Sequence, residues 1–233
     1  MIAMYPLRQL LQLLALLLLP IIPDAAAGQS SGSGVRLLLP GGFQTRSRPQ
    51  VGQLDWFGVY AAGPGYELRR TAVTVEDTPF GCGGAGRRIT ASGPSQPLLL
   101  VAGLAALREG RIDTAFTGRR FVYPGESISL NLSDQHRYRL DAFGSAKPGV
   151  SGVDFADYEL VLRLRSQSQV LATYPHVNVD APPELLWAGD LDRDGRVDLL
   201  ADRGGYQYTL FLSSMATANG LVAQAADFAT TTC

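Results

Sequence analysis

Strict alternation of apolar and polar residues runs through the second half of the chain. Every second residue is apolar in three segments, 127–132, 137–142 and 158–165, and most residues between them are polar or charged. A β-strand points successive side chains to opposite faces of its sheet, so this pattern predicts half-buried antiparallel strands with one solvated face. A stretch rich in Gly and Ser, 144–154, is expected to form a loop between the second and third of these strands.

Apolar runs bounded by turn residues predict further strands. These runs are 35–39, 54–62, 66–76, 88–90, 170–174, 185–188, 197–201 and 206–212. The turn sequence Gly63-Pro64-Gly65 joins the second run to the third, so this pair is expected to form a hairpin. Two segments leave alternatives open. Residues 97–107 fit a strand at 98–101 and a short helix at 104–110, and residues 221–228 fit a short strand or a short helix.

Many short strands at fairly regular spacing indicate an all-β fold, mainly antiparallel and sandwich-like, with at most one or two short helices. Periodicity alone does not give the strand order. Residues 35–233 are enough for one β-rich domain with a sizeable core, or for two small lobes.

The N-terminal segment has a different composition. Arg8 precedes a nearly unbroken apolar run, 10–22, and small residues follow up to Ala27. The run is too short for a membrane span, which needs about 20 residues. We therefore predict a cleaved secretory signal peptide at 1–27, a flexible leader at 28–34, and a periplasmic or secreted protein without a transmembrane segment after cleavage.

Charge and cysteine content narrow the function classes. The formal net charge is −1, and no basic patch has the size that nucleic-acid binding needs, so the expected partner is a protein or a glycan. Cys82 and Cys233 are the only cysteines. In an oxidising compartment they are expected to form a disulfide, which would stabilise the fold by about 5 kcal/mol in the chain-entropy model; two free thiols are the alternative. Neither has a CxxC partner or a neighbouring His, which argues against redox catalysis and zinc.

The sharpest chemical signal is an acidic loop, GDLDRDGRVD at 189–198, between two predicted strands. Its acids occupy positions 1, 3, 5 and 9 of the loop: Asp190, Asp192, Asp194 and Asp198. Alternate side chains of a tight turn converge on one point, and Ca²⁺ prefers 6–8 oxygen ligands. Gly195, at position 6, can take the positive φ that keeps the chain around an ion. The backbone carbonyl of Arg196 is expected to supply a further oxygen, and Asp198 to close the site.

This loop is not an EF-hand, because Ala201 stands where the bidentate Glu belongs and the flanks predict strands. The segment GDLDRDGRVDLLAD resembles the calcium loop of FG-GAP/VCBS-type repeats, and that resemblance implies Ca²⁺ held by the aspartates between two strands. Such loops occur in β-propellers, but the nearest second copy, 109–113, lacks the first two acids, with Ala105 and Leu107 in their places. A full propeller is therefore not expected. The alternative is an acidic surface turn without an ion.

Other candidate sites have weaker signals. His136 and His176 are isolated in the sequence, and Glu67, Glu76 and Asp77 could pair as glycosidase acids. One aromatic set could form the core or a sugar-stacking platform: Trp56, Phe57, Tyr60 and Tyr66. The triplet Asn131-Leu132-Ser133 matches a glycosylation acceptor but lies in a predicted strand.

No GxSxG, HExxH or P-loop motif is present. The sequence therefore favours a non-catalytic exported domain with one structural Ca²⁺ site, acting as a structural, adhesion or ligand-binding module. A secreted hydrolase with a site assembled from distant residues, or a carbohydrate-binding module, are the alternatives.

Overall fold

The fold is all-β in a computed structural model that describes residues 34–44, 48–79, 85–133, 136–149, 153–178, 182–204 and 206–231. Within these residues the chain forms strands and no helix. The prediction of a mainly antiparallel, sandwich-like all-β fold is therefore confirmed. The expected signal peptide, nearly all of the leader, and both Cys82 and Cys233 lie outside the described residues, so those expectations stay predictions.

The strands form four antiparallel sheets. The N-terminal sheet has the order β1 (Arg36–Leu38), β7 (Leu100–Ala102), β3 (Trp56–Ala62), β4 (Gly65–Thr71) and β8 (Gly110–Ile112). The small sheet has the order β2 (Gly41–Phe43), β6 (Ala85–Ala91) and β5 (Val73–Pro79). The central sheet has the order β17 (Ala223–Ala229), β16 (Gln207–Leu212), β15 (Asp198–Asp202), β14 (Glu184–Gly189) and β9 (Thr114–Phe121). The outer sheet has the order β10 (Ser127–Asn131), β11 (Arg137–Pro148), β12 (Val153–Leu164) and β13 (Gln167–Val177).

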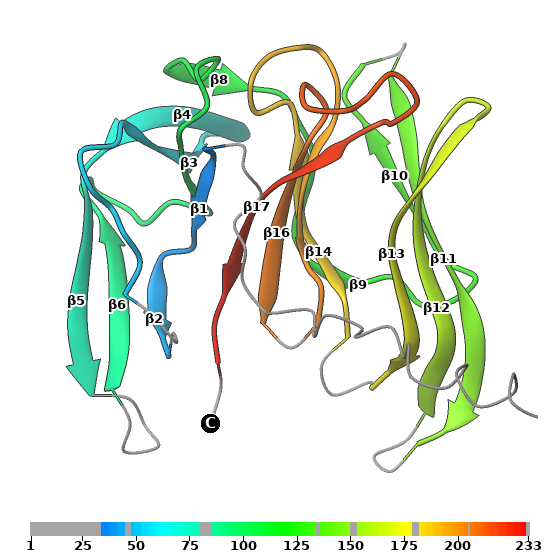
Figure 1. The fold of residues 1–233 in the computed structure, drawn as a ribbon. Helices are drawn as coiled ribbons and strands as arrows, with labels where there is room; N and C mark the ends of the chain where they lie inside the picture. The colour runs from blue at the N-terminus through cyan, green and yellow to red at the C-terminus, as the bar shows by residue number, and fades with distance from the viewer. Residues whose placement is uncertain are drawn as a thin grey trace, which may run out of the picture.

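The central sheet lies between the other layers, with the N-terminal and small sheets on one side and the outer sheet on the other (Figure 1). Its strands contribute alternate residues to two apolar cores. On β15, Leu200 belongs to the core shared with the N-terminal and small sheets, whereas Leu199 and Ala201 belong to the core shared with the outer sheet. Both faces of β14, β15 and β16 are therefore buried, which explains why these strands are mainly continuous apolar runs rather than alternating ones.

Several element predictions are confirmed. The hairpin across Gly63-Pro64-Gly65 forms between β3 and β4, with Trp56 opposite Thr71. The three alternating segments become β10, β11 and β12, and their apolar residues pack on the central sheet. The open alternative at 221–228 is decided in favour of a strand, β17.

Other element predictions are wrong. Residues 104–110 form turns rather than a helix, and β8 begins at the end of that segment. The expected loop at 144–154 is largely taken up by β11 and β12, which extend toward each other as a long hairpin. The run 66–76 is not one strand, because Ala72 separates β4 from β5, and the two belong to different sheets. No long apolar helix suited to crossing a membrane occurs in the part of the chain that the structure describes.

Candidate metal centre

The acidic loop connects β14 to β15 at one end of the central sheet, as the predicted strand–loop–strand arrangement requires. Gly189 is the last residue of β14, and Asp198 is the first residue of β15. The backbone N–H of Asp190 donates to the carbonyl of Asp113, 2.9 Å away, which anchors the loop to the start of β9. Arg193 Nη2 donates to the Glu109 carbonyl at 3.0 Å. The segment 109–113 therefore packs against the acidic loop.

Three of the predicted acids converge. Carboxylate oxygens of Asp190, Asp192 and Asp194 all lie within 4.8 Å of one another, so the group could hold a metal ion. Asp190 and Asp192 are buried, whereas Asp194 is exposed. Gly195 has φ +80° with open space around its Cα, so the backbone conformation alone selects glycine there.

Asp190 organises the turn as well as facing the other acids. Its Oδ1 accepts a hydrogen bond from the Asp194 N–H at 2.9 Å, and its Oδ2 accepts one from the Gly195 N–H at 2.8 Å. Burial raises the pKa of Asp190, and the charges of Asp194 and Asp192 raise it further, against the two backbone hydrogen bonds that lower it. The concentration of negative charge is therefore energetically unfavourable without a counter-charge.

Asp192 carries the clearest sign of an absent partner group. Its side chain is 8% exposed. One oxygen, Oδ2, accepts a hydrogen bond from the Ser214 hydroxyl, whereas Oδ1 is fully buried and has no hydrogen-bond partner among the described residues. A buried, unpartnered carboxylate oxygen costs free energy, and a cation among the three acids would satisfy it.

Asp198 lies at the base of the loop and is completely buried. Its Oδ2 accepts from the Leu191 N–H at 2.8 Å, and its Oδ1 accepts from the Ser213 N–H at 2.8 Å. Burial raises the pKa of this carboxyl to about 8, despite these hydrogen bonds. Asp198 thus joins the loop to the end of β16, and its expected role as a metal ligand stays a prediction.

Arg196 pairs with the exposed acid of the cluster. Its Nη2 lies 2.7 Å and its Nε 3.0 Å from Oδ2 of Asp194. This ion pair offsets part of the negative charge on the outer side of the loop. The expected ligand role of the Arg196 backbone carbonyl stays a prediction.

Two serines complete the site and were not predicted. The Ser213 hydroxyl lies 3.0 Å from Oδ1 of Asp198 and 3.0 Å from Oδ2 of Asp194, and Ser214 bonds Asp192. Both follow β16, which pairs with β15 so that Leu199 lies opposite Phe211. The residues directly after β16 are therefore level with the acidic loop. The strand register would have revealed them, but no local sequence motif does.

Neither histidine is a member of the acidic cluster. His176, whose side chain is 58% exposed on β13, has Nε2 3.3 Å from Oδ2 of Asp154. His136 is half-buried beside Tyr138, with ring centroids 6.4 Å apart.

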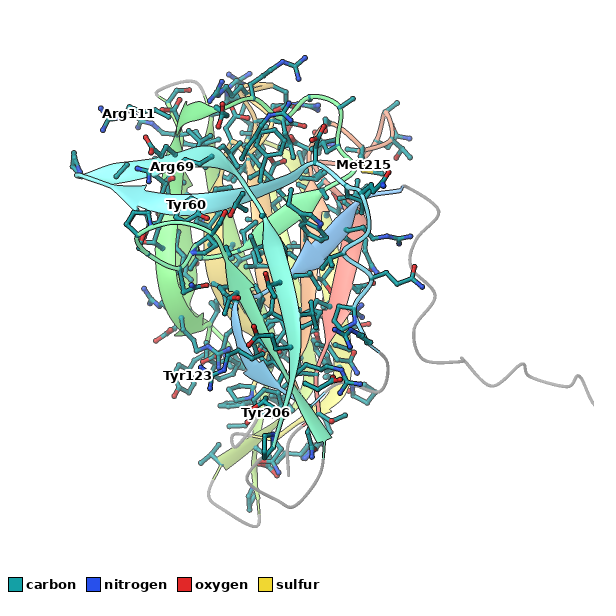
Figure 2. All side chains as sticks on the ribbon, turned by 90° about the vertical axis from the view of Figure 1, so that its left-hand side faces the viewer. Tyr60, Arg69, Arg111, Tyr123, Tyr206 and Met215 are labelled. Atoms are coloured by element: carbon teal, nitrogen blue, oxygen red, sulfur yellow. The ribbon has the colours of Figure 1, made fainter. Side chains whose placement is uncertain are left out.

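The aromatic set does not form an exposed row. Trp56, Phe57 and Tyr60 are buried, and Tyr66 is half-buried. The guanidinium carbon of Arg69 lies 5.4 Å from the centre of the Tyr60 ring (Figure 2), and the Tyr60 hydroxyl donates to the Ser92 carbonyl. These side chains therefore pack in the interior, as the core alternative predicts.

The suggested glycosidase acids are divided between two sheets. Glu67 pairs with Arg69 on β4 of the N-terminal sheet. Asp77, on β5 of the small sheet next to Glu76, pairs with two arginines, Arg48 and Arg87. Glu67 and Asp77 thus form ion pairs with different arginines and lie on different sheets.

The acidic loop is therefore the candidate site with the most support from geometry. Comparison of the chain with protein-family models, with curated proteins and with solved structures finds no match.

Proposed function

We propose that this protein is an exported, non-catalytic β domain that holds one structural Ca²⁺ in the loop between β14 and β15. In the periplasm or outside the cell it would act as a structural, adhesion or ligand-binding module. The observation that carries the proposal is the convergence of Asp190, Asp192 and Asp194 around a buried oxygen of Asp192 that has no hydrogen-bond partner.

The donor atoms favour calcium among the common metals. The three acids offer only oxygen, whereas zinc sites in proteins mostly use His and Cys. Ca²⁺ accepts irregular sets of 6–8 oxygens, and Mg²⁺ demands a near-octahedral set and usually keeps several waters. The Arg196 carbonyl and an oxygen of Asp198 would add to the ligand set. The resemblance to FG-GAP/VCBS-type loops supports the same ion.

A structural role fits the groups around the loop. The three acids contact backbone N–H groups, two serine hydroxyls and Arg196. An ion would neutralise the charges of Asp192 and Asp194, which raise the pKa of Asp190, and it would join the loop to the end of β16 through Ser213 and Ser214. The expected consequence is a more stable central sheet.

Thermal unfolding with and without calcium tests the proposal. The mature protein is heated in Ca²⁺ and in EDTA, beside Asp192→Asn, which removes a ligand charge with almost no change in shape. Ca²⁺ at a hundredfold excess over Kd should stabilise the wild type by about 2.7 kcal/mol and leave the variant unchanged. Asp55→Asn, at a 77% exposed carboxylate in the N-terminal half, is the matched control and should respond as the wild type does.

An absence of any calcium effect on the wild type would refute the proposal. An equal effect on Asp192→Asn would place the ion elsewhere in the molecule. A stronger stabilisation by Zn²⁺ than by Ca²⁺ would contradict the identity of the ion.

A further inference from the structure

One face of the outer sheet is covered by no layer that the described residues form. Its inner face packs on the central sheet, and no described strand lies beyond its outer face (Figure 1). Along β11 and β12, the residues that alternate with the buried Tyr138, Leu140 and Leu162 point outward. The strand register therefore places Arg139 directly opposite Arg163 on this outer face.

Two like charges opposite each other normally destabilise a sheet. Here a buried carboxylate lies beside both arginines. Arg139 Nε is 2.7 Å from Oδ1 of Asp141, and Arg163 Nε is 2.7 Å from Oδ2. The Ser127 hydroxyl donates to Oδ1 at 2.7 Å. Burial acts to raise the pKa of Asp141, but the Ser127 hydrogen bond and the two arginine charges outweigh it and lower the pKa. Asp141 therefore places one negative charge between the positive charges of Arg139 and Arg163.

This arrangement holds two guanidinium groups in place and leaves positive charge in excess. A guanidinium has five N–H donors, and each arginine has its Nε next to an oxygen of Asp141, although the Arg163 N–H is not aligned for a hydrogen bond. The side chains of Arg139 and Arg163 remain 57% and 38% exposed. Their terminal amino groups are thus available to an anionic group from outside, without a further cost of ordering the side chains.

Neutral hydrogen-bonding groups, a further arginine and one exposed ring surround the two arginines, together with the exposed Glu159, which lies opposite Phe143. Ser129 lies opposite Arg139, and Asn131 lies opposite Arg137, at an open hollow of about 560 Å³ that Leu132 and Ser133 also line. Further along β11, Phe143 is 44% exposed, and its ring centre is 5.7 Å from the guanidinium carbon of Arg163.

We propose that this face binds an acidic polysaccharide. Carboxylate or sulfate groups of the polymer would pair with Arg139 and Arg163, because the guanidinium fork matches both. Sugar hydroxyls would bond to Ser129 and Asn131, and a sugar ring would lie against Phe143. The proposal goes beyond the calcium site, which lies on other strands, and does not depend on it.

Charge complementarity and composition favour this occupant over a folded protein partner. Protein interfaces have an apolar centre that is depleted of charge. The large apolar side chains exposed at described positions of this face are Phe143 and Val170, and β10 contributes Ser127, Ser129 and Asn131 instead. A face of strands bearing hydroxyls, amides and cations suits an extended, hydrated and anionic chain.

Affinity gel electrophoresis and calorimetry with polygalacturonate and with dextran sulfate test the proposal, with neutral dextran as the reference. The double variant Arg139→Gln and Arg163→Gln should bind at least tenfold more weakly than the wild type. The matched control is the double variant Arg48→Gln and Arg70→Gln. Each of these arginines is 58% exposed and forms an ion pair with a different Asp. The control should change affinity less than twofold, and EDTA should not change wild-type binding.

A second variant keeps the test decisive if loss of both arginines unfolds the sheet. Ser129→Asp adds a negative charge beside Arg139 without removing any bond of Asp141, and it should weaken binding severalfold. Thr74→Asp, at an exposed position of β5, is its control and should have no effect.

The proposal is overturned if neither acidic polymer binds, if dextran binds equally well, or if the controls lose as much affinity as the variants. Equal binding of polyglutamate would also overturn it, because the face would then recognise negative charge without the sugar.

Discussion

The central sheet and the outer sheet are both antiparallel, but they bury their strands in different ways. All five residues of β15, Asp198–Asp202, are buried, whereas β10, Ser127–Asn131, alternates strictly between exposed and buried positions. The central sheet has an apolar layer on each side, and the outer sheet has one on a single side. Hydropathy along a strand thus reports how many layers cover its sheet.

The same difference decides how each sheet carries charge. In the outer sheet, arginines lie on the solvated face, and the buried acid Asp141 pairs with both Arg139 and Arg163. At the end of the central sheet, Asp190 and Asp192 are buried beside each other, and the described residues supply backbone N–H groups and hydroxyls more than cations. An ion has a larger effect where solvent cannot screen the acids.

Alanine substitution of neighbouring residues should separate the two sheets most clearly. Leu199→Ala and Leu200→Ala should each reduce the free energy of unfolding by about 2–5 kcal/mol, because each opens a cavity in a different core. In β10, Leu130→Ala should cost a similar amount, whereas Ser129→Ala should stay within about 0.5 kcal/mol. Urea unfolding measures all four. A negligible cost for either Leu199→Ala or Leu200→Ala would contradict burial of both faces.

Within the acidic loop, Asp198→Ala should have a larger effect than Asp192→Ala when EDTA is present. Removing Asp198 leaves the N–H groups of Leu191 and Ser213 without their acceptor in a buried place, which should cost about 2–4 kcal/mol. Removing Asp192 takes away a buried oxygen that has no partner, so stability in EDTA should fall little or rise. Adding Ca²⁺ should reduce the difference between the two variants. Asp198→Ala keeps the three acids of the cluster and should be stabilised by the ion, whereas Asp192→Ala lacks one of them. Equal losses in EDTA would contradict the distinct roles.

Sequence periodicity is sufficient to predict the strands that have one solvated face. It does not predict which sheet each strand joins. Alternation identified β10, β11 and β12, because each such strand reports its own burial. The split of 66–76 at Ala72 was not visible, because β4 and β5 are both compatible with one long β-branched run and differ only in their partners. The hairpin at 144–154 has the composition of a loop, because the end of β11, residues 143–148, is exposed and has no apolar alternation.

The candidate site was predictable where its ligands are local. Asp190, Asp192 and Asp194 converge because a single turn brings alternate residues together, and this geometry is encoded in ten residues. Ser213 and Ser214 could not be found in the same way. They reach the loop only through the pairing of β15 with β16, which the sequence does not specify without the strand order.

One isosteric substitution compares a fully buried position with an exposed one. Val222, directly before β17, is buried against the outer sheet, and Val222→Thr should cost about 1–3 kcal/mol because it buries a hydroxyl. Val170 on β13 is 50% exposed, and Val170→Thr should stay within about 0.5 kcal/mol. Chemical denaturation of both variants provides the measurement. Similar costs at the two positions would mean that β13 is covered in solution.

The smallest effect is expected from the charge cluster of the outer sheet, and it should depend on pH. The pKa of Asp141 is lowered in the folded protein, since the Ser127 hydrogen bond and the charges of Arg139 and Arg163 outweigh the effect of burial. Its contribution to stability is therefore present above the pKa of an unfolded Asp, about 3.9, and is lost as the pH falls through the lower folded value. Asp141→Asn should cost about 1 kcal/mol at pH 7, because both arginines are more than a third exposed and solvent screens the pairs. The difference between variant and wild type should vanish in acid, whereas Asp55→Asn, at an exposed pair with Arg70, should show little difference at either pH. A cost for Asp141→Asn that persists unchanged at low pH would assign it to lost packing rather than to charge.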